Sequence, residues 1–377
     1  MRILIGISYY YPNVSGLSIY AKNLAESLAS QGHKVEVITS RHTGELEYKS
    51  KENNVSVKRV WTPFKIGRGA IMPTYVLEAY KSVKEADVVN CHIPSFEIVI
   101  LVILAKLLRR KVIITHHCDL SNWPGLINQI TERITYLSLL ISGMLADKIV
   151  VYTKDYADSS VYLKHFKDKL VYILPPVKVV VAKKKMARIY KGIHPKIGFA
   201  GRVAREKGIK YLLEAITHID KKITSNLKIF IAGPKKEVIG GGFEEEFNKL
   251  YKKYKSKIIY LGALNELEMA DFYSMLDILV LPSIERIESF GFVQVEAMLS
   301  GCPVVASNMP GVRMPIVLSG MGELAEIRDS KSIASKITKI LTSRKKYVKS
   351  QKTIQAIFNY HNTINAYGEL FKNISKK

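Results

Sequence analysis

Short apolar runs alternate with helix-spaced apolar residues along the first part of the chain. Residues 2–7 form such a run, a turn rich in Pro, Ser and Gly covers 12–16, and a helical pattern then ends at Gln31-Gly32. This alternation predicts a parallel β-sheet covered by helices on both faces. The same rhythm continues with predicted strands at 35–39, 86–90 and 112–115 and a helix at 96–108.

The alternation stops between Pro175 and Pro195 and then starts again. Prolines end helices and central strands, so this stretch predicts a linker. The strands predicted after it are 196–200, 227–232, 257–261, 278–281 and 303–306. Two domains are also the usual outcome for 377 residues.

The predicted fold class is therefore α/β, with one domain at 1–178 and a second at 179–352. A helical segment at 353–377 could pack on either domain, and a return to the N-terminal domain is the favoured arrangement. Ligands of parallel sheets bind beyond the carboxyl ends of the strands. Two such sheets predict a cleft between two sets of strand ends.

Composition favours a globular protein of a reducing compartment. The hydrophobic share of 47% and the charged share of 24% are ordinary for a soluble domain. The chain starts with a strand pattern in place of a leader, and its longest apolar run, 98–105, is far shorter than a bilayer span. Three scattered cysteines without a C-x-x-C predict neither a disulfide framework nor a zinc site. We expect a cytoplasmic location.

The net charge of +24 is unusual, because 57 Lys and Arg residues stand against 33 Asp and Glu residues. Such an excess favours a polyanionic partner, either nucleic acid or an anionic membrane surface. A solvated lysine-rich surface is the alternative. No RNA-binding signature occurs, so nucleic acid is not the expected partner. The residues of the N-terminal half that could lie on a membrane are Phe64, Lys65, Arg68, Ile71 and Met72.

The segment 281–305 carries the richest candidate chemistry. A strand ends at Pro282, and Gly291 opens a helix, whose free N-terminal amides are suited to phosphate. Glu288 and Glu296 lie eight positions apart, roughly 12 Å along a helix, which is comparable with a ribose–diphosphate–sugar unit. The spacing alone is uninformative, since it also occurs in Glu206/Glu214 and Glu237/Glu245. The 288/296 pair differs by lying on a strand–loop–helix junction.

Two motifs resemble those of a known enzyme family. Glu288 and Glu296 frame seven residues, which resembles the E-x7-E signature of retaining glycosyltransferases of family 4. Gly201-Arg202 followed by Lys207-Gly208 is similar to the family's G-R-x-x-x-x-K-G donor-phosphate segment. The resemblance implies the GT-B fold, which consists of two facing Rossmann-like domains with an interdomain cleft. It also implies an enzyme of the phosphatidylinositol-mannosyltransferase type that uses a nucleoside-diphosphate sugar.

The resemblance also implies roles for individual residues. Arg202 and Lys207 would stabilise the leaving diphosphate, Glu296 would hold the ribose hydroxyls, and Glu288 those of the donor sugar. The backbone amides of 289–292 would face sugar or phosphate. The further residues expected to bind the donor are Gly16, Gly262, Ser289, Phe290, Gly291 and Phe292.

In the N-terminal half, His117 follows a predicted strand and resembles the family's histidine that touches the donor sugar. The neighbouring His116 leaves the register open. A metal site at 116–119 is disfavoured, because adjacent residues at a strand end point to different sides. No D-x-D motif occurs. We therefore expect no metal and no cofactor beyond the sugar donor.

The chain departs from the family pattern at three places. The glycine-rich loop reads Ser15-Gly16 where G-G is frequent, which leaves its turn geometry open. Residues 175–177 read Pro-Pro-Val where N-G-x-D is usual, and residues 310–314 read Pro-Gly-Val-Arg-Met where G-G-x-P-E is usual. The last change suggests an altered nucleotide or acceptor environment.

The resemblance implies retaining, front-face transfer, in which the leaving phosphate takes the acceptor's proton. The catalytic residues would be His117, Glu288, Arg202 and Lys207, with His117 and Glu288 acting by positioning and charge. Polyprenyl-phosphate-linked glycans or phospholipids at the inner membrane face are the leading acceptors. A soluble sugar or sugar-phosphate acceptor, a sugar-nucleotide epimerase, a phosphorylase and a nucleic-acid-binding protein remain as alternatives.

Overall fold

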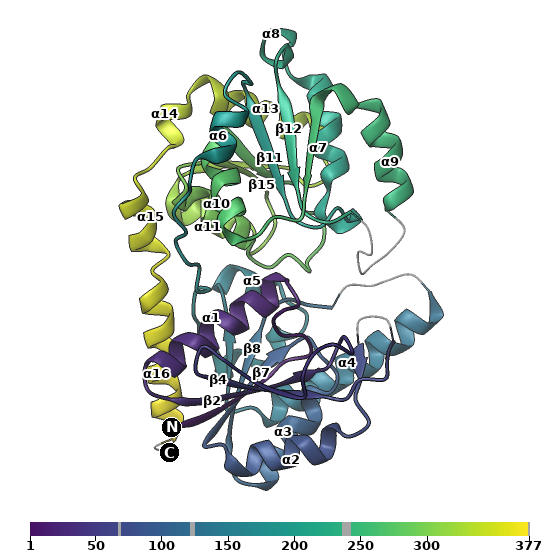
Figure 1. The fold of residues 1–377 in the computed structure, drawn as a ribbon, viewed down its shortest axis with the longest axis vertical. Coiled ribbons are helices and arrows are strands. Elements are labelled where there is room, and N and C mark those ends of the chain that lie inside the picture. The colour runs from purple at the N-terminus through teal and green to yellow at the C-terminus, as the bar shows by residue number, and fades with distance from the viewer. Residues whose placement is uncertain (67–68, 121–124, 236–242, 376–377) are drawn as a thin grey trace. The chain divides into compact units, whose positions relative to one another are not determined.

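The computed structural model describes residues 1–66, 69–120, 125–235 and 243–375 and divides into two compact units (Figure 1). The first unit comprises Met1–Pro176 and Tyr360–Lys377, and the second comprises Val177–Asn359. Each unit contains its own parallel sheet. The two units are therefore described one after the other.

The first unit is built on an eight-stranded sheet with the order β10-β9-β8-β7-β1-β2-β4-β3. All neighbouring strands are parallel except β3 and β4, and Ile3 at the centre pairs with Val35 and Val88. The strands are β1 (Arg2–Gly6), β2 (Lys34–Ser40), β3 (Lys49–Glu52), β4 (Val55–Val60), β7 (Val88–Ile93), β8 (Lys111–His116), β9 (Lys148–Val151) and β10 (Leu170–Tyr172). A separate antiparallel hairpin joins β5 (Phe64–Ile66) and β6 (Gly69–Ile71).

Helices cover both faces of this sheet, as the buried central strands require. One face carries α2 (Tyr75–Glu85), α3 (Ile98–Leu107) and α4 (Leu126–Leu145), which pack side by side (Figure 1). The other face carries α1 (Gly16–Ser30) and α16 (Tyr360–Ser375). The short helix α5 (Lys154–Ser159) follows β9. A 3-10 helix at Leu163–Lys169 leads into β10.

The second unit has a six-stranded, entirely parallel sheet with the order β13-β12-β11-β14-β15-β16. Its strands are β11 (Lys196–Ala200), β12 (Lys228–Ala232), β13 (Ile258–Gly262), β14 (Ile278–Leu281), β15 (Val304–Ser307) and β16 (Gly322–Ala325). Its helices are α6 (Lys185–Ile189), α7 (Ile209–Ala215), α8 (Lys221–Thr224), α9 (Glu244–Lys253), α10 (Glu266–Met275), α11 (Phe292–Leu299), α12 (Met314–Ser319), α13 (Ser330–Thr342), α14 (Arg344–Tyr347) and α15 (Gln351–Ile357).

The C-terminal segment predicted at 353–377 consists of two helices that belong to different units. Helix α15 packs on α11 and α12 in the second unit, and α16 packs on α1 in the first. Hydroxyl contacts hold α16 against α1. The Tyr367 and Tyr20 hydroxyls lie 2.6 Å apart, and the Tyr360 and Ser27 hydroxyls also lie 2.6 Å apart. The last helix is therefore a structural part of the first unit.

Phe371 tests this role of α16, because its side chain is fully buried in the first unit. We expect Phe371→Ala to lower the free energy of unfolding by about 3–5 kcal/mol through lost burial and a cavity. The neighbouring Lys372 is exposed, so Lys372→Ala should change it by less than about 0.5 kcal/mol. Urea unfolding followed by circular dichroism measures both values. Equal stability of the two variants would contradict the role given to α16.

Candidate functional site

The loops that follow β11 and β14 are in close contact at the carboxyl edge of the second sheet. A Cβ added to Gly208, after β11, would lie 1.9 Å from the carbonyl oxygen of Pro282, after β14, and the φ of Gly208 is +65°. The Ile284 amide also donates to the Glu206 carbonyl at 2.9 Å. This close approach requires glycine. It places the Lys207 ammonium 2.5 Å from the Glu288 carboxylate, which joins the two motifs found in the sequence.

Arg202 forms the second ion pair of this edge. Its guanidinium lies 2.9 Å from the carboxylate of Glu206, which is almost completely buried. A buried carboxylate fixes the direction of a partly exposed guanidinium, which is suited to binding a phosphate. Sequence reasoning treated Glu206 as part of a chance spacing and missed this contact. The sequence signal is that Glu206 lies inside the motif, four residues after Arg202.

Glu296 lies on α11, and the Tyr273 hydroxyl from α10 donates to its carboxylate at 2.7 Å. Burial raises the pKa of Glu296, the Tyr273 hydrogen bond opposes this rise, and the charge of Glu266 adds to it. A carboxylate held in this way can accept hydrogen bonds from hydroxyl groups of a ligand. The structure thus supplies a polar partner for the partly buried Glu296 carboxylate.

The helix that carries Glu296 begins at a strained turn. Gly291 has a φ of +79°, and a Cβ there would lie 2.5 Å from the Leu281 side chain. The N-cap residue of α11 is this glycine, which has no side chain to cap the helix. The Phe290 side chain is buried against Phe292 and Phe358, so only the backbone at 290 could face a ligand.

Gln294 is a second residue that sequence reasoning missed. Its buried amide donates to the carbonyls of Phe290 at 2.9 Å and Val312 at 2.8 Å. These hydrogen bonds connect the N-terminal end of α11 to the loop at 310–314. In this loop the chain departs from the family pattern. Two further predicted residues lie near strand ends: Gly262 ends β13 with a φ of +75°, and Ser289 is buried before α11.

His117 belongs to a buried chain of hydrogen bonds at the end of β8. Asn90 donates through Nδ2 to the Ile113 carbonyl at 3.2 Å, so its Oδ1 accepts from His92 Nε2 at 3.0 Å. His92 Nδ1 must then accept from His117 Nε2 at 2.8 Å. The remaining nitrogen, Nδ1 of His117, accepts from the Tyr152 hydroxyl. Both ring nitrogens of His117 are thus engaged.

The histidines of this network are neutral. Burial lowers the pKa of His117 well below its usual value, and the neighbouring His92 and His116 lower it further. Burial also lowers the pKa of His92 to about 3. A neutral His117 cannot supply positive charge to a departing phosphate.

His116 points away from this network. Its ring stacks on Tyr162 with centroids 5.3 Å apart, and its Nε2 lies 3.3 Å from the Asp119 carboxylate. The two adjacent histidines therefore occupy different environments, as the alternation along a strand requires. Within the described ranges, no three His, Cys, Asp or Glu side chains gather as a metal site would require.

Gly16 is the first residue of α1 and follows a capped turn. Ser15 and Ser18 form a reciprocal capping box, in which each side chain accepts from the other's amide at 3.2 and 2.8 Å. Ser15 thus replaces a glycine by a helix cap. The capping box therefore defines the turn geometry at Ser15-Gly16, which the sequence left open.

Three polar groups at the carboxyl edge of the first sheet were missed in the sequence. Tyr9, His42 and Glu97 follow β1, β2 and β7, and the Tyr9 hydroxyl, His42 Nδ1 and Glu97 Oε2 are buried with no hydrogen-bond partner among the described residues. Burial raises the pKa of Glu97 and raises that of Tyr9 to about 12. Unpartnered buried groups at strand ends are candidates for ligand binding. The sequence signal for this cluster is that all three residues follow parallel strands of the same sheet.

The residues predicted to lie on a membrane differ in exposure. Phe64 and Lys65 are exposed, Ile71 is partly buried, and Met72 is buried, so Met72 cannot contribute to a surface. Arg68 lies outside the described residues. Across the described chain, no helix has both the length and the apolar character needed to cross a bilayer.

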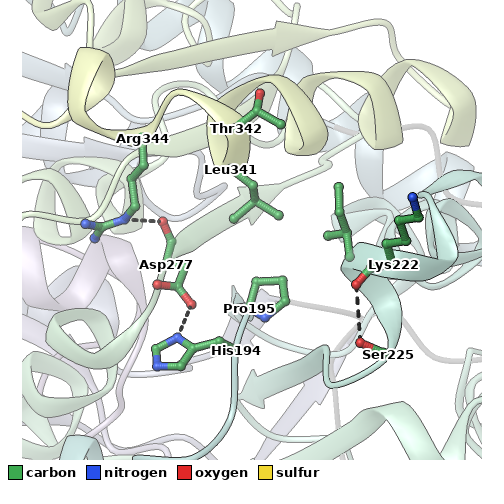
Figure 2. Close-up of a pocket in the computed structure, with 9 residues that line it drawn as sticks. His194, Pro195, Lys222, Ser225, Asp277, Leu341, Thr342 and Arg344 are labelled. Carbon is green, nitrogen blue, oxygen red and sulfur yellow. Dashed lines mark hydrogen bonds and ion pairs between the residues drawn. The ribbon is translucent and has the colours of Figure 1, made fainter.

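An open pocket of about 360 Å³ lies at the opposite edge of the second sheet (Figure 2). His194 and Pro195 precede β11, and Asp277 precedes β14, so the pocket is at the amino ends of these strands. The Asp277 carboxylate lies 3.3 Å from His194 Nδ1, and its carbonyl accepts from Arg344 at 3.2 Å. This pocket is separate from the ion pairs at the carboxyl edge.

Two family models together match most of the chain. Residues 14–179 match the family model Glycosyltransferase Family 4, and residues 184–356 match Glycosyl transferases group 1. The chain is 26% identical over 376 residues to an uncharacterized glycosyltransferase of Methanocaldococcus jannaschii, covering 89% of this chain and 88% of the relative. It is also 26% identical over 332 residues to the alpha-monoglucosyldiacylglycerol synthase of Acholeplasma laidlawii, covering 81% and 80%.

The fold is similar to that of two solved structures. HepE of Anabaena, crystallised in complex with UDP-glucose, matches with a TM-score of 0.78 at 16% identity, over 99% of this chain and 100% of that one. Sucrose-phosphate synthase from Thermosynechococcus elongatus matches with a TM-score of 0.75 at 19% identity, over 99% and 98%. The predicted GT-B architecture is confirmed by these likenesses.

The raised pKa of Glu296 predicts that its carboxylate lowers the free energy of unfolding by an amount that depends on pH. Because burial disfavours its ionised form, the wild type should lose stability relative to Glu296→Gln as pH rises from about 4.5 through the raised value. Urea unfolding between pH 4 and 8 measures this difference. Glu369 has an exposed side chain, so Glu369→Gln should show no such trend. A difference for Glu296→Gln that stays constant with pH would contradict the assignment.

Proposed function

Since the chain is a family 4-like glycosyltransferase with the GT-B fold, we propose that it transfers a sugar from a nucleoside-diphosphate sugar to a lipid-linked glycan or glycolipid at the cytoplasmic membrane face. We further propose that the anomeric configuration is retained. The main support for donor binding in the second unit is the contact of Lys207 with Glu288, which lies beside the Arg202–Glu206 pair. Acceptor binding is inferred from the buried polar groups at the carboxyl edge of the first sheet.

The donor side of the reaction needs positive charge where the leaving diphosphate develops negative charge. Arg202 and Lys207 are cations at the carboxyl edge, and the N-terminal end of α11 adds partial positive charge. Glu296 accepts hydrogen bonds from the ribose hydroxyls, and Glu288 from those of the sugar. The acceptor oxygen bonds to the anomeric carbon, the bond to the diphosphate breaks, and the acceptor's proton passes to the leaving phosphate.

His117 acts in this scheme by position and not as a base. Its two nitrogens are held by His92 and Tyr152, and its pKa is lowered by burial. A neutral, fixed imidazole defines the wall of a sugar site without adding charge. We propose that no divalent ion takes part, because Arg202 and Lys207 supply charge stabilisation that a metal would otherwise provide.

The acceptor side is proposed at the unpartnered groups of the first sheet. Tyr9, His42 and Glu97 offer a hydroxyl, a ring nitrogen and a carboxyl oxygen, which suit the hydroxyl groups of an acceptor. A lipid acceptor is favoured because the synthase of Acholeplasma laidlawii is named for a glucosylated diacylglycerol and because the chain carries a charge of +24. A soluble sugar or sugar phosphate is the rival acceptor.

A thermal-shift screen tests the donor half. UDP-glucose is the first probe because HepE binds it, and other nucleotide-sugars follow. We expect a true donor at a concentration 100 times its Kd to stabilise the wild type by about 2.7 kcal/mol. Lys207→Met should weaken donor binding at least about tenfold, through loss of the phosphate cation. Lys210→Met is the control, since Lys210 pairs with Glu246 on the neighbouring helix. Each measurement is made with and without EDTA, which should not change the shift.

A labelled-donor assay tests the acceptor half. The donor found in the screen is offered with diacylglycerol, polyprenyl phosphate or free glucose, and butanol extraction separates lipid products from soluble ones. We expect a lipid product, and Glu97→Gln should lower kcat/KM for the acceptor about tenfold while the donor thermal shift is unchanged. Glu85→Gln is the control, because Glu85 is exposed and precedes β7, at the amino edge of the same sheet. Only soluble products would replace the lipid acceptor by its rival.

A further inference from the structure

Helix α4 presents a continuous apolar stripe to solvent. Leu126 is 73% exposed, and Ile134 and Leu137 are 58% and 59% exposed. At 100° per residue the whole stripe falls within a sector of roughly 80° and extends about 27 Å along the helix. Its members are Leu126, Ile130, Ile134, Leu137, Ile141 and Met144, of which Ile141 is partly buried.

The fold does not require this stripe, because the opposite side of α4 makes the internal contacts. Leu139 is buried in the core, and the Ser138 hydroxyl donates to the Phe96 carbonyl at 2.6 Å. Solvent-facing apolar residues are common singly, but an ordered row on one helix marks an interaction surface.

The stripe has apolar neighbours on the same unit. A Cβ at Gly69 would lie 3.1 Å from the Phe96 ring, so Phe96 contacts both the β5–β6 hairpin and, through Ser138, helix α4. The hairpin exposes Phe64 and Ile66. The adjacent helix α3, which packs on α4, exposes Leu107. The apolar surface therefore extends beyond one helix.

The charges beside this surface are basic. Arg133 is exposed about 20° beyond the edge of the sector of the stripe, and Lys65 is exposed on the hairpin between Phe64 and Ile66. Arg109 is exposed just after α3. An apolar helix face with basic residues along it is the pattern that binds an anionic membrane interface. A second copy of the chain fits less well, since antiparallel pairing about the middle of the stripe would bring two Arg133 side chains together.

We propose that the outward face of α4, together with the β5–β6 hairpin, lies in the headgroup region of an anionic bilayer. This inference deepens the proposed function and rests on its lipid acceptor, because it names the surface by which the enzyme reaches the lipid. The helix would lie in the plane of the membrane with its stripe turned toward the acyl chains. Arg133 and Lys65 would contact the anionic headgroups.

Vesicle flotation at low salt tests the proposal, with phosphatidylcholine vesicles that contain or lack phosphatidylglycerol. We expect the wild type to float with the anionic vesicles, and the double variant Ile134→Glu/Leu137→Glu to bind at least tenfold more weakly. Both side chains are exposed, so the melting temperature should be unchanged. Val317→Glu on α12, whose side chain is 58% exposed, is the matched control and should float like the wild type.

Three outcomes would overturn the proposal. The first is a wild type that does not bind anionic vesicles, and the second is equal binding of the wild type and the double variant. The third is a dimeric wild type, seen by light scattering, that the double variant converts to a monomer. Lys207→Met separates this inference from the proposed function, because it should lose the donor response and still float. Vesicle binding without any nucleotide-sugar response would remove the proposed function alone.

Discussion

The contact between Gly208 and the Pro282 carbonyl determines the candidate donor site. Two strands, β11 and β14, are neighbours in the sheet, and the loops that follow them carry different motifs. Since a Cβ at 208 would overlap the Pro282 carbonyl, only glycine allows the loops to approach so closely. Lys207 and Glu288 are then brought within 2.5 Å, although 81 residues separate them in the chain. The glycine of the phosphate motif thus has a packing role as well.

The cations at the same edge are paired with carboxylates. Arg202 pairs with the carboxylate of Glu206 and Lys207 with that of Glu288, so the charge of each cation is compensated. The two partners differ in exposure: Glu206 is almost completely buried and stays with Arg202, whereas Glu288 is only partly buried. A carboxylate at the position of Glu288 can exchange its lysine for sugar hydroxyls. In the proposed reaction this exchange would release Lys207 toward the donor phosphate.

The sequence allowed the α/β class, the central strands and the pairing of the two motifs to be predicted, because buried parallel strands are short apolar runs between glycine and proline signals. It did not allow β4 to be predicted, since Lys58 and Arg59 interrupt its apolar run. The structure satisfies these two charges with Glu36 and Glu52. It also did not reveal that α15 and α16 belong to different units, because their helical patterns are continuous along the chain. Pairing of distant polar groups is a tertiary property, so Gln294 and Tyr273 were missed as well.

The first unit illustrates why a residue type does not define its role. In sequence, His117 is a histidine at a strand end, a position at which a histidine can act as an acid, a base or a metal ligand. In the structure, Asn90 fixes the proton on His92, and His92 fixes the proton on His117. A proton can leave His117 only if this whole chain of donors and acceptors reverses. Such a histidine is suited to hold a shape and not to exchange protons, which agrees with a transfer in which the leaving phosphate itself receives the acceptor's proton.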